Sequence, residues 1–168
     1  MSDDINPSQL LIEIANSLLW VRSDSAEGHD RGPMVDQFEK CLGGTVLGES
    51  YCMFFVQYCV KQVEARLGIQ SNIFRSGYCM AVWNSSPVLM RRPAPPAAGQ
   101  IVIWNRRGTT QGHTGIVTGM RSPAVFTTIE GNTSPGMGIE AEGLGVYAKE
   151  RTLSGNAMFE LKGFLQPF

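Results

Sequence analysis

Gly48-Glu49-Ser50-Tyr51-Cys52-Met53-Phe54-Phe55-Val56 is the stretch that decides the fold, because a loop signal gives way there to an amphipathic helix. Apolar side chains then recur at helical spacing as far as Leu67, and Gly68 is expected to end the helix. Ser50 suits the N-cap position, which places Cys52 in the first turn, on the inward face. A thiol at a helix N-terminus feels the positive end of the helix dipole, so its thiolate is favoured. Cys52 is therefore the candidate nucleophile.

The rest of the chain divides into predicted helices before residue 90 and predicted strands after residue 99. An apolar repeat follows Asn6-Pro7-Ser8, a short helix is expected from Pro33, and another at Tyr78–Trp83. Residues 91–99 are a linker that is too proline-rich for regular structure. Strands are then predicted at Gln100–Asn105, Thr114–Met120, Ala124–Glu130, Gly145–Arg151 and Leu161–Leu165. This order indicates an α+β fold, with N-terminal helices packed on a C-terminal antiparallel sheet in one domain over residues 1–168.

His113 is the candidate base for the Cys52 thiol. The chain has two histidines; His29 lies in a polar loop and is expected at the surface, whereas His113 opens a strand about 60 residues after Cys52. A helix-borne cysteine followed by a strand-borne histidine is the arrangement that a cysteine amidase or peptidase needs.

A predicted hairpin supplies candidates to orient the His113 ring. A tight turn near Arg121 would set His113 across from Glu130, give or take a residue, and Asn132 would share the face of Glu130. In this arrangement His113 would either deprotonate Cys52 or form an ion pair with it, and the thiolate would attack an amide carbonyl. The protonated imidazole would then release the amine, and water would hydrolyse the thioester. Glu130 would stabilise the imidazolium, and Asn132 is the weaker candidate for that role. The backbone N–H of Cys52 is expected to stabilise the oxyanion.

The three remaining cysteines, Cys41, Cys59 and Cys79, are interpreted as small core residues. No paired C-x-x-C spacing is present, so a structural zinc site is not expected, and neither a metal nor a cofactor is predicted. Reduced thiols fit a cytoplasmic origin.

The charge of the chain bounds its partners. A formal net charge of -1 and the lack of a basic stripe argue against a nucleic-acid partner. The apolar run Leu10–Val21 is too short to span a bilayer, so membrane insertion is not expected. The acidic start at Met1-Ser2-Asp3-Asp4 is unlike a secretory signal, so synthesis in the cytoplasm is expected.

At these residues the chain resembles the CHAP family, the cysteine- and histidine-dependent amidohydrolases/peptidases of the papain-like superfamily. The resemblance rests on four stretches in family order: Asp30–Val35, Gly48–Val56, Pro96–Trp104, and Gly112–Val117 with Ile129–Thr133. It implies a papain-like fold and hydrolysis of a peptidoglycan amide bond. Cys52 would be the nucleophile, His113 the base, and Glu130, with Asn132, the orienting group; Glu49, Ser50 and Tyr51 are assigned to the oxyanion and substrate-binding part of the site.

The leading interpretation is a monomeric peptidoglycan amidase or endopeptidase, acting at the cell wall or periplasm as a phage lysin or a secreted effector. A cognate inhibitor protein is a further candidate partner. Two alternatives stay open: a cytosolic cysteine protease or deamidase that acts on a protein, and a non-catalytic binding module of the same fold.

Overall fold

The computed structural model describes residues 5–24, 26–28, 30–136, 138–139 and 143–168, and His29 lies outside them. Within these ranges the helices come first. They are α1 (Pro7–Ser17), α2 (Pro33–Lys40), α3 (Cys52–Leu67), α4 (Cys79–Ser85) and the short 3-10 helix η1 (Val88–Met90). The expected order of helices before strands is confirmed.

Local sequence signals set the ends of the two longest helices. The Asn6 side chain accepts hydrogen bonds from the backbone of the first turn of α1. Gly68 ends α3 in the left-handed conformation, with φ 65°. The start of α3 differs from the expectation, because Tyr51 and not Ser50 occupies the N-cap: its backbone carbonyl accepts the first helical hydrogen bond, from Phe55.

The strands form one antiparallel sheet in the order β1-β6-β2-β3-β4-β5. Their bounds are β1 (Arg91–Arg92), β2 (Ile101–Arg106), β3 (Gly112–Ser122), β4 (Val125–Thr133), β5 (Gly145–Thr152) and β6 (Phe159–Leu165). The prediction of an irregular linker is wrong for Arg91–Arg92, whose backbone extends the sheet beside β6. Such a short edge strand limits unwanted pairing.

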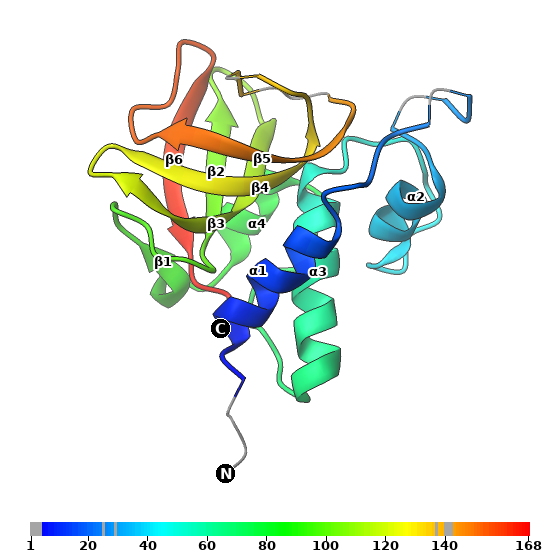
Figure 1. The fold of residues 1–168 in the computed structure, drawn as a ribbon, viewed down its shortest axis with the longest axis horizontal. Helices are drawn as coiled ribbons and strands as arrows, with labels where there is room; N and C mark the ends of the chain where they lie inside the picture. Colours follow the sequence, from blue (N-terminus) through cyan, green and yellow to red (C-terminus); the bar gives the residue numbers. More distant parts are fainter. Residues whose placement is uncertain (1–4, 25, 29, 137, 140–142) are drawn as a thin grey trace.

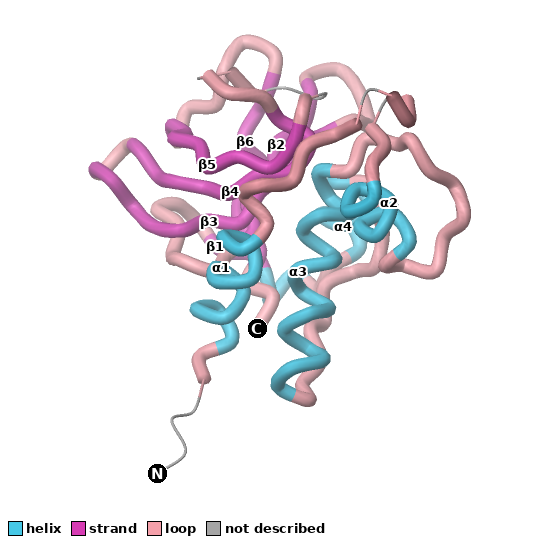
Figure 2. Tube along the Cα trace, turned by 45° about the vertical axis from the view of Figure 1, so that its right-hand side comes forward, coloured by secondary structure: helices cyan, strands magenta, loops and turns pink. Residues whose placement is uncertain are grey.

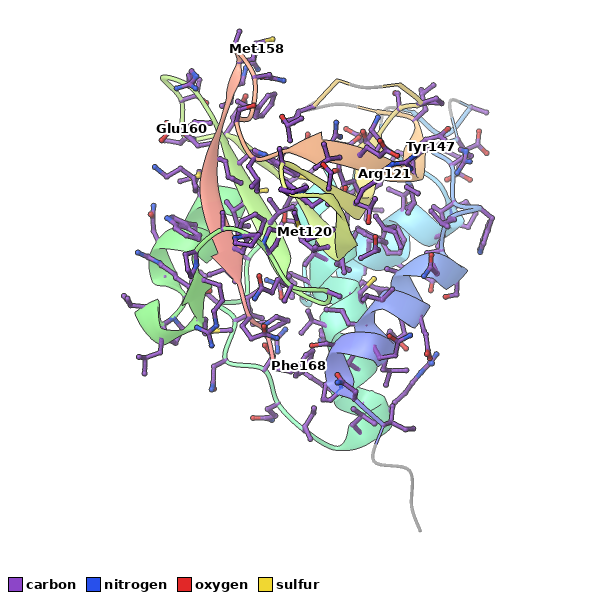
Figure 3. All side chains as sticks on the ribbon, turned by 60° about the vertical axis from the view of Figure 1, so that its left-hand side comes forward. Met120, Arg121, Tyr147, Met158, Glu160 and Phe168 are labelled. Atoms are coloured by element: carbon purple, nitrogen blue, oxygen red, sulfur yellow. The ribbon has the colours of Figure 1, made fainter. Side chains whose placement is uncertain are left out.

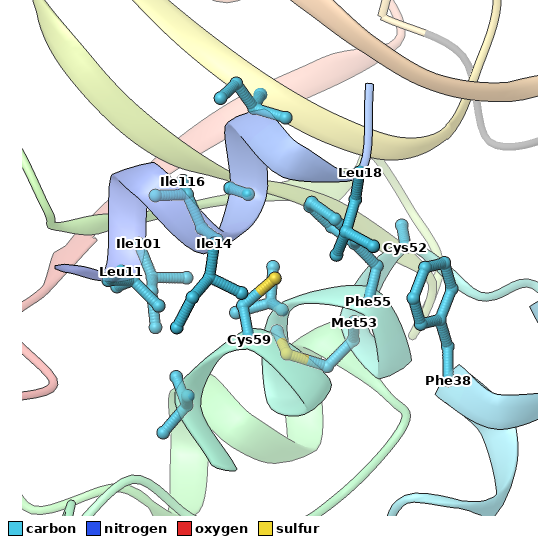
Figure 4. Close-up of a cluster of buried hydrophobic side chains, with 14 of the residues drawn as sticks. Leu11, Ile14, Leu18, Phe38, Cys52, Met53, Phe55, Cys59, Ile101 and Ile116 are labelled. Carbon is cyan, nitrogen blue, oxygen red and sulfur yellow. The ribbon is translucent and has the colours of Figure 1, made fainter. Parts of the chain in front are cut away.

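The helices gather on one side of the sheet, and α1 lies beside α3 (Figures 1 and 2). A buried cluster joins them to the sheet; Figure 4 shows Phe38, Phe55 and Cys52 at one end of it and Leu11 and Ile101 at the other. Loss of an aromatic ring from such a core costs about 3–5 kcal/mol of stability. This α+β arrangement agrees with the expected papain-like fold.

A second cluster fills the opposite face of the curved sheet, around Trp104, Phe126 and Phe164. His113 pairs directly with Trp104 across β2 and β3, and therefore lies on the face of this second cluster. β6 pairs with both β1 and β2, and Figure 3 shows Met158 and Phe168 at its opposite ends. No helix in the described ranges has the length and apolar character needed to cross a membrane.

Candidate active site

Cys52 is the first residue of α3, as the sequence predicts. Its side chain is 3% exposed and lines a cleft of about 480 Å³. The backbone N–H of Met53 stabilises the thiolate, in keeping with the free N–H groups at a helix start. Cys52 thus belongs to the buried core and also lines the cleft.

The residues before Cys52 divide between the core and the cleft. The prediction of a substrate-binding role for the Tyr51 side chain is wrong, because that side chain is fully buried. Its hydroxyl contacts Ser23 Oγ at 3.0 Å, and burial raises the pKa of Tyr51 to about 12. Glu49 and Ser50 do line the cleft, and Glu49 Oε1 accepts a hydrogen bond of 3.2 Å from the Tyr78 hydroxyl.

Glu39 of α2 holds this loop in place, and the sequence pattern does not reveal it. Its carboxylate, 1% exposed, accepts hydrogen bonds from the backbone N–H groups of Gly48 (3.1 Å) and Glu49 (2.6 Å). Burial raises the pKa of Glu39 despite these bonds. The buried carboxylate therefore holds the backbone three and four residues before the nucleophile.

His113 opens β3 and is completely buried. Its Nε2 lies 2.9 Å from Glu130 Oε2, so the predicted hydrogen bond to an orienting group is present. Because an ionised carboxylate only accepts, Nε2 carries the proton. The other ring nitrogen, Nδ1, is buried without a hydrogen bond of ordinary geometry among the described residues, although the ring does interact with Cys52.

The hairpin that joins these residues has a different register from the expected one. The turn falls between Ser122 and Val125, and two irregularities shift the pairing before Ile116 meets Ile129. Continued by one residue, this register sets Gly115, and not His113, opposite Glu130. An ideal Cβ on Gly115 would lie 2.5 Å from Glu130 Cγ, so the absence of a side chain there lets Glu130 lean across β3 toward His113.

Glu130 is held by further buried groups that sequence reasoning missed. Arg151 of β5 donates from Nε to Glu130 Oε1 at 2.7 Å and from Nη2 to Oε2, and the Thr128 hydroxyl donates to Oε1 at 2.6 Å. Burial opposes ionisation, but the Arg151 and His113 contacts outweigh it and lower the pKa of Glu130 to about 2. Arg151 could have been found from its position in a predicted strand, because a charged residue on a buried strand face needs a partner of opposite charge.

Among the described residues, the His113 ring has no hydrogen bond to Asn132. Its Oδ1 accepts a hydrogen bond of 2.9 Å from the backbone N–H of Gly143, and its backbone has φ 54°. The prediction that Asn132 orients the histidine is therefore replaced by a role in holding the backbone at Gly143, while the hydrogen bond to the His113 ring comes from Glu130.

Cys52 and His113 stabilise each other's charged forms. A hydrogen bond with Cys79, followed by the contact with His113, outweighs burial and lowers the pKa of Cys52. Burial lowers the pKa of His113, but its contacts with Cys52 and Glu130 outweigh that effect and raise it. These interactions favour the thiolate of Cys52 and the imidazolium of His113.

Cys79 is close to the nucleophile, which the sequence did not reveal. Its Sγ lies 3.7 Å from Cys52 Sγ, and it also lines the cleft. The interpretation of Cys79 as a packing residue is therefore incomplete, whereas Cys59 is fully buried in the core as expected.

Comparison with known families agrees with this geometry. The CHAP domain matches residues 44–132, more than half of the chain. The chain belongs to the CHAP domain family. The CHAP domain is a hydrolase family of amidases and peptidases, commonly acting on peptidoglycan. No curated protein and no solved structure matches the chain.

The CHAP match covers only part of the site. It includes Cys52, Cys79, His113 and Glu130, whereas Glu39 and Arg151, which hold the loop and the carboxylate, lie outside the matched residues. Among the described residues, no group of three or more His, Cys, Asp or Glu side chains is arranged to hold a metal ion.

Proposed function

We propose that this CHAP domain is a cysteine hydrolase that cleaves an amide bond of peptidoglycan peptides through a thioester. One observation carries the proposal: the buried His113 ring is hydrogen-bonded to Glu130 and interacts with Cys52, and Cys52 lines a cleft. Nucleophile, base and orienting group are the set that thiol-dependent acyl transfer requires.

The chemistry follows from the charges of the pair. The Cys52 thiolate attacks the amide carbonyl carbon, and the His113 imidazolium gives its proton to the departing amine as the C–N bond breaks. The neutral ring then takes a proton from water, which attacks the thioester and releases the carboxylic acid and the thiolate. Arg151 keeps Glu130 ionised, and Glu130 stabilises the imidazolium each time His113 takes up a proton.

The backbone N–H of Cys52 is the proposed oxyanion donor. It belongs to the first turn of α3, whose N–H groups have no partner within the helix. A donor placed there acts on the negative charge that develops on the carbonyl oxygen, away from bulk water.

The cleft suits a peptide that carries both signs of charge. Glu49 and Arg106 both line it, together with Thr110 and Gln111. Arg106 Nη1 donates to Gln111 Oε1 at 3.1 Å, which steadies the cation. A wall peptide offers free carboxylates, which suit Arg106, and free amines at its cross-linking positions, which suit Glu49.

The proposed place of action is the cell wall or periplasm, reached from the cytoplasm by release as a phage lysin or by injection as an effector. A monomer would suffice, because Cys52, His113 and Glu130 all come from one chain. A cognate inhibitor protein in the producing cell is the partner that such a delivered enzyme would need.

The test compares two substrates with one protein. Dye-labelled peptidoglycan and dye-labelled denatured protein are incubated with the wild type and with Cys52→Ala. We expect soluble dye from peptidoglycan with the wild type alone. Release from the protein but not from peptidoglycan would instead identify a protease, and binding without release by either variant would identify a non-catalytic module.

A further inference from the structure

Two sulfur atoms meet in the cleft of this CHAP domain. Cys52 Sγ and Cys79 Sγ lie 3.7 Å apart, within reach of an S–H···S hydrogen bond, and both cysteines are free thiols. Cys52 is the first residue of α3 and Cys79 is the first residue of α4, so the starts of these two helices lie close together. Both side chains line the cleft in which the peptide would bind.

The surroundings decide which sulfur donates. Besides Cys79, His113 and the backbone N–H of Met53 favour the thiolate of Cys52. The hydrogen bond with Cys52, together with burial, raises the pKa of Cys79 well above its ordinary value. Cys52 therefore loses its proton first, and a protonated Cys79 is left beside a thiolate.

We propose that Cys79 is a second catalytic thiol, whose S–H donates to Cys52 Sγ and holds the nucleophile as a thiolate before the substrate binds. This role rests on the proposed function for its reaction, but the hydrogen bond itself acts in the free protein. A buried anion needs hydrogen bonds to replace those it loses from water, and the Cys79 S–H supplies one of them.

The position of Cys79 is fixed by a close approach to β3. An ideal Cβ on Gly112 would lie 2.9 Å from Cys79 Cβ and 2.5 Å from the backbone oxygen of Trp104. The glycine before His113 thus makes room for the residue that contacts Cys52. The same short segment of β3 carries the base and admits the second thiol.

The proposal predicts a particular signature. A hydrogen bond to the thiolate raises the thiolate fraction at low pH but makes each thiolate less nucleophilic. Without the donor, the reactivity of Cys52 should move to higher pH, while its plateau at high pH is kept or rises. Simple damage to the site would lower the plateau and leave the pH midpoint in place.

The experiment measures Cys52 alkylation by iodoacetamide against pH in the full chain, with the modified peptide quantified by mass spectrometry. We expect the midpoint of Cys79→Ala to lie at least about one pH unit above that of the wild type. Cys79→Ser, which keeps a donor, should lie between the two. Cys59→Ala, which removes another buried thiol, should match the wild type.

A wild-type midpoint in folded Cys79→Ala would overturn the proposal. If the circular dichroism spectrum shows that Cys79→Ala does not fold, Cys79→Val takes its place, since valine fills the site and offers no donor. Because alkylation needs no peptide substrate, a shifted midpoint in a protein that leaves peptidoglycan intact would sink the proposed function and not the hydrogen bond.

Discussion

Glu130 Oε2 lies 2.9 Å from His113 Nε2 although the two residues do not face each other in the hairpin. The contact is diagonal: Glu130 passes over Gly115, and Arg151 holds both of its oxygens from the far side. The geometry of the base therefore depends on a residue that carries no functional group.

The missing side chain at Gly115 gives the first prediction. Gly115→Ala adds a Cβ that would meet Glu130 Cγ, so Glu130 must move and His113 loses its support. We expect kcat/KM on peptidoglycan fragments to fall about 10²-fold or more, because proton transfer by a positioned base contributes at least that much. Gly119→Ala, on the same strand with nothing within 4 Å, is the matched control. Equal activity of the two variants would contradict the account.

The charged pair predicts a bell-shaped pH profile. The pKa of Cys52 is lowered to about 5 and that of His113 is raised to about 9. Cys52 is therefore a thiolate above the first value and His113 an imidazolium below the second, so kcat/KM should be highest between them. A profile that rises through pH 8–9, as for an ordinary thiol near pKa 8.5, would be inconsistent with the pair.

The alkaline limb also reports on Glu130. Because the contact with Glu130 raises the pKa of His113, Glu130→Gln should move that limb to lower pH as well as reduce the rate. If the alkaline limb of Glu130→Gln matches that of the wild type, a group other than Glu130 raises the pKa of His113.

The two neighbouring thiols predict a defined response to hydrogen peroxide. The Cys52 thiolate attacks one peroxide oxygen, which gives a sulfenic acid and releases hydroxide. The Cys79 sulfur then attacks Cys52 Sγ, water leaves, and a disulfide forms after the sulfurs close from 3.7 Å to about 2.05 Å. Intact mass should fall by two hydrogens, and dithiothreitol should restore activity. Accumulation of sulfinic acid on Cys52 in the wild type, as expected for Cys79→Ala, would argue against this route.

Glu39 predicts a stability effect at a distance from the chemistry. Glu39→Ala removes the acceptor of two backbone N–H groups, those of Gly48 and Glu49, from a buried site. We expect the free energy of unfolding in urea to fall by about 1–3 kcal/mol. Glu13→Ala, an exposed change on α1, should stay within about 0.5 kcal/mol of the wild type. If both variants lose the same free energy of unfolding, the two hydrogen bonds to Glu39 do not stabilise the loop.

The sequence predicts the parts of this molecule that depend on local periodicity. The apolar spacing of α3 and its closing Gly68 place Cys52 at a helix start, and strand alternation places His113 and Glu130 on neighbouring strands. Register depends on bulges near Val117 and Met120, which no local pattern marks, so the predicted facing pair was two residues off. Cys79, Arg151 and Glu39 act through contacts between distant segments, which only the folded chain brings together.

The most direct test of the central claim is the mass of the fragments released from purified peptidoglycan. Wild type and Cys52→Ala are incubated with the same preparation, and the soluble products are separated and weighed. The wild type should release fragments, and each cleaved bond should leave one new carboxyl group on one side of the break and one new amino group on the other. Cys52→Ala should release no fragments above the buffer blank. Identical fragment profiles from the two proteins would contradict the assignment of Cys52 as the nucleophile.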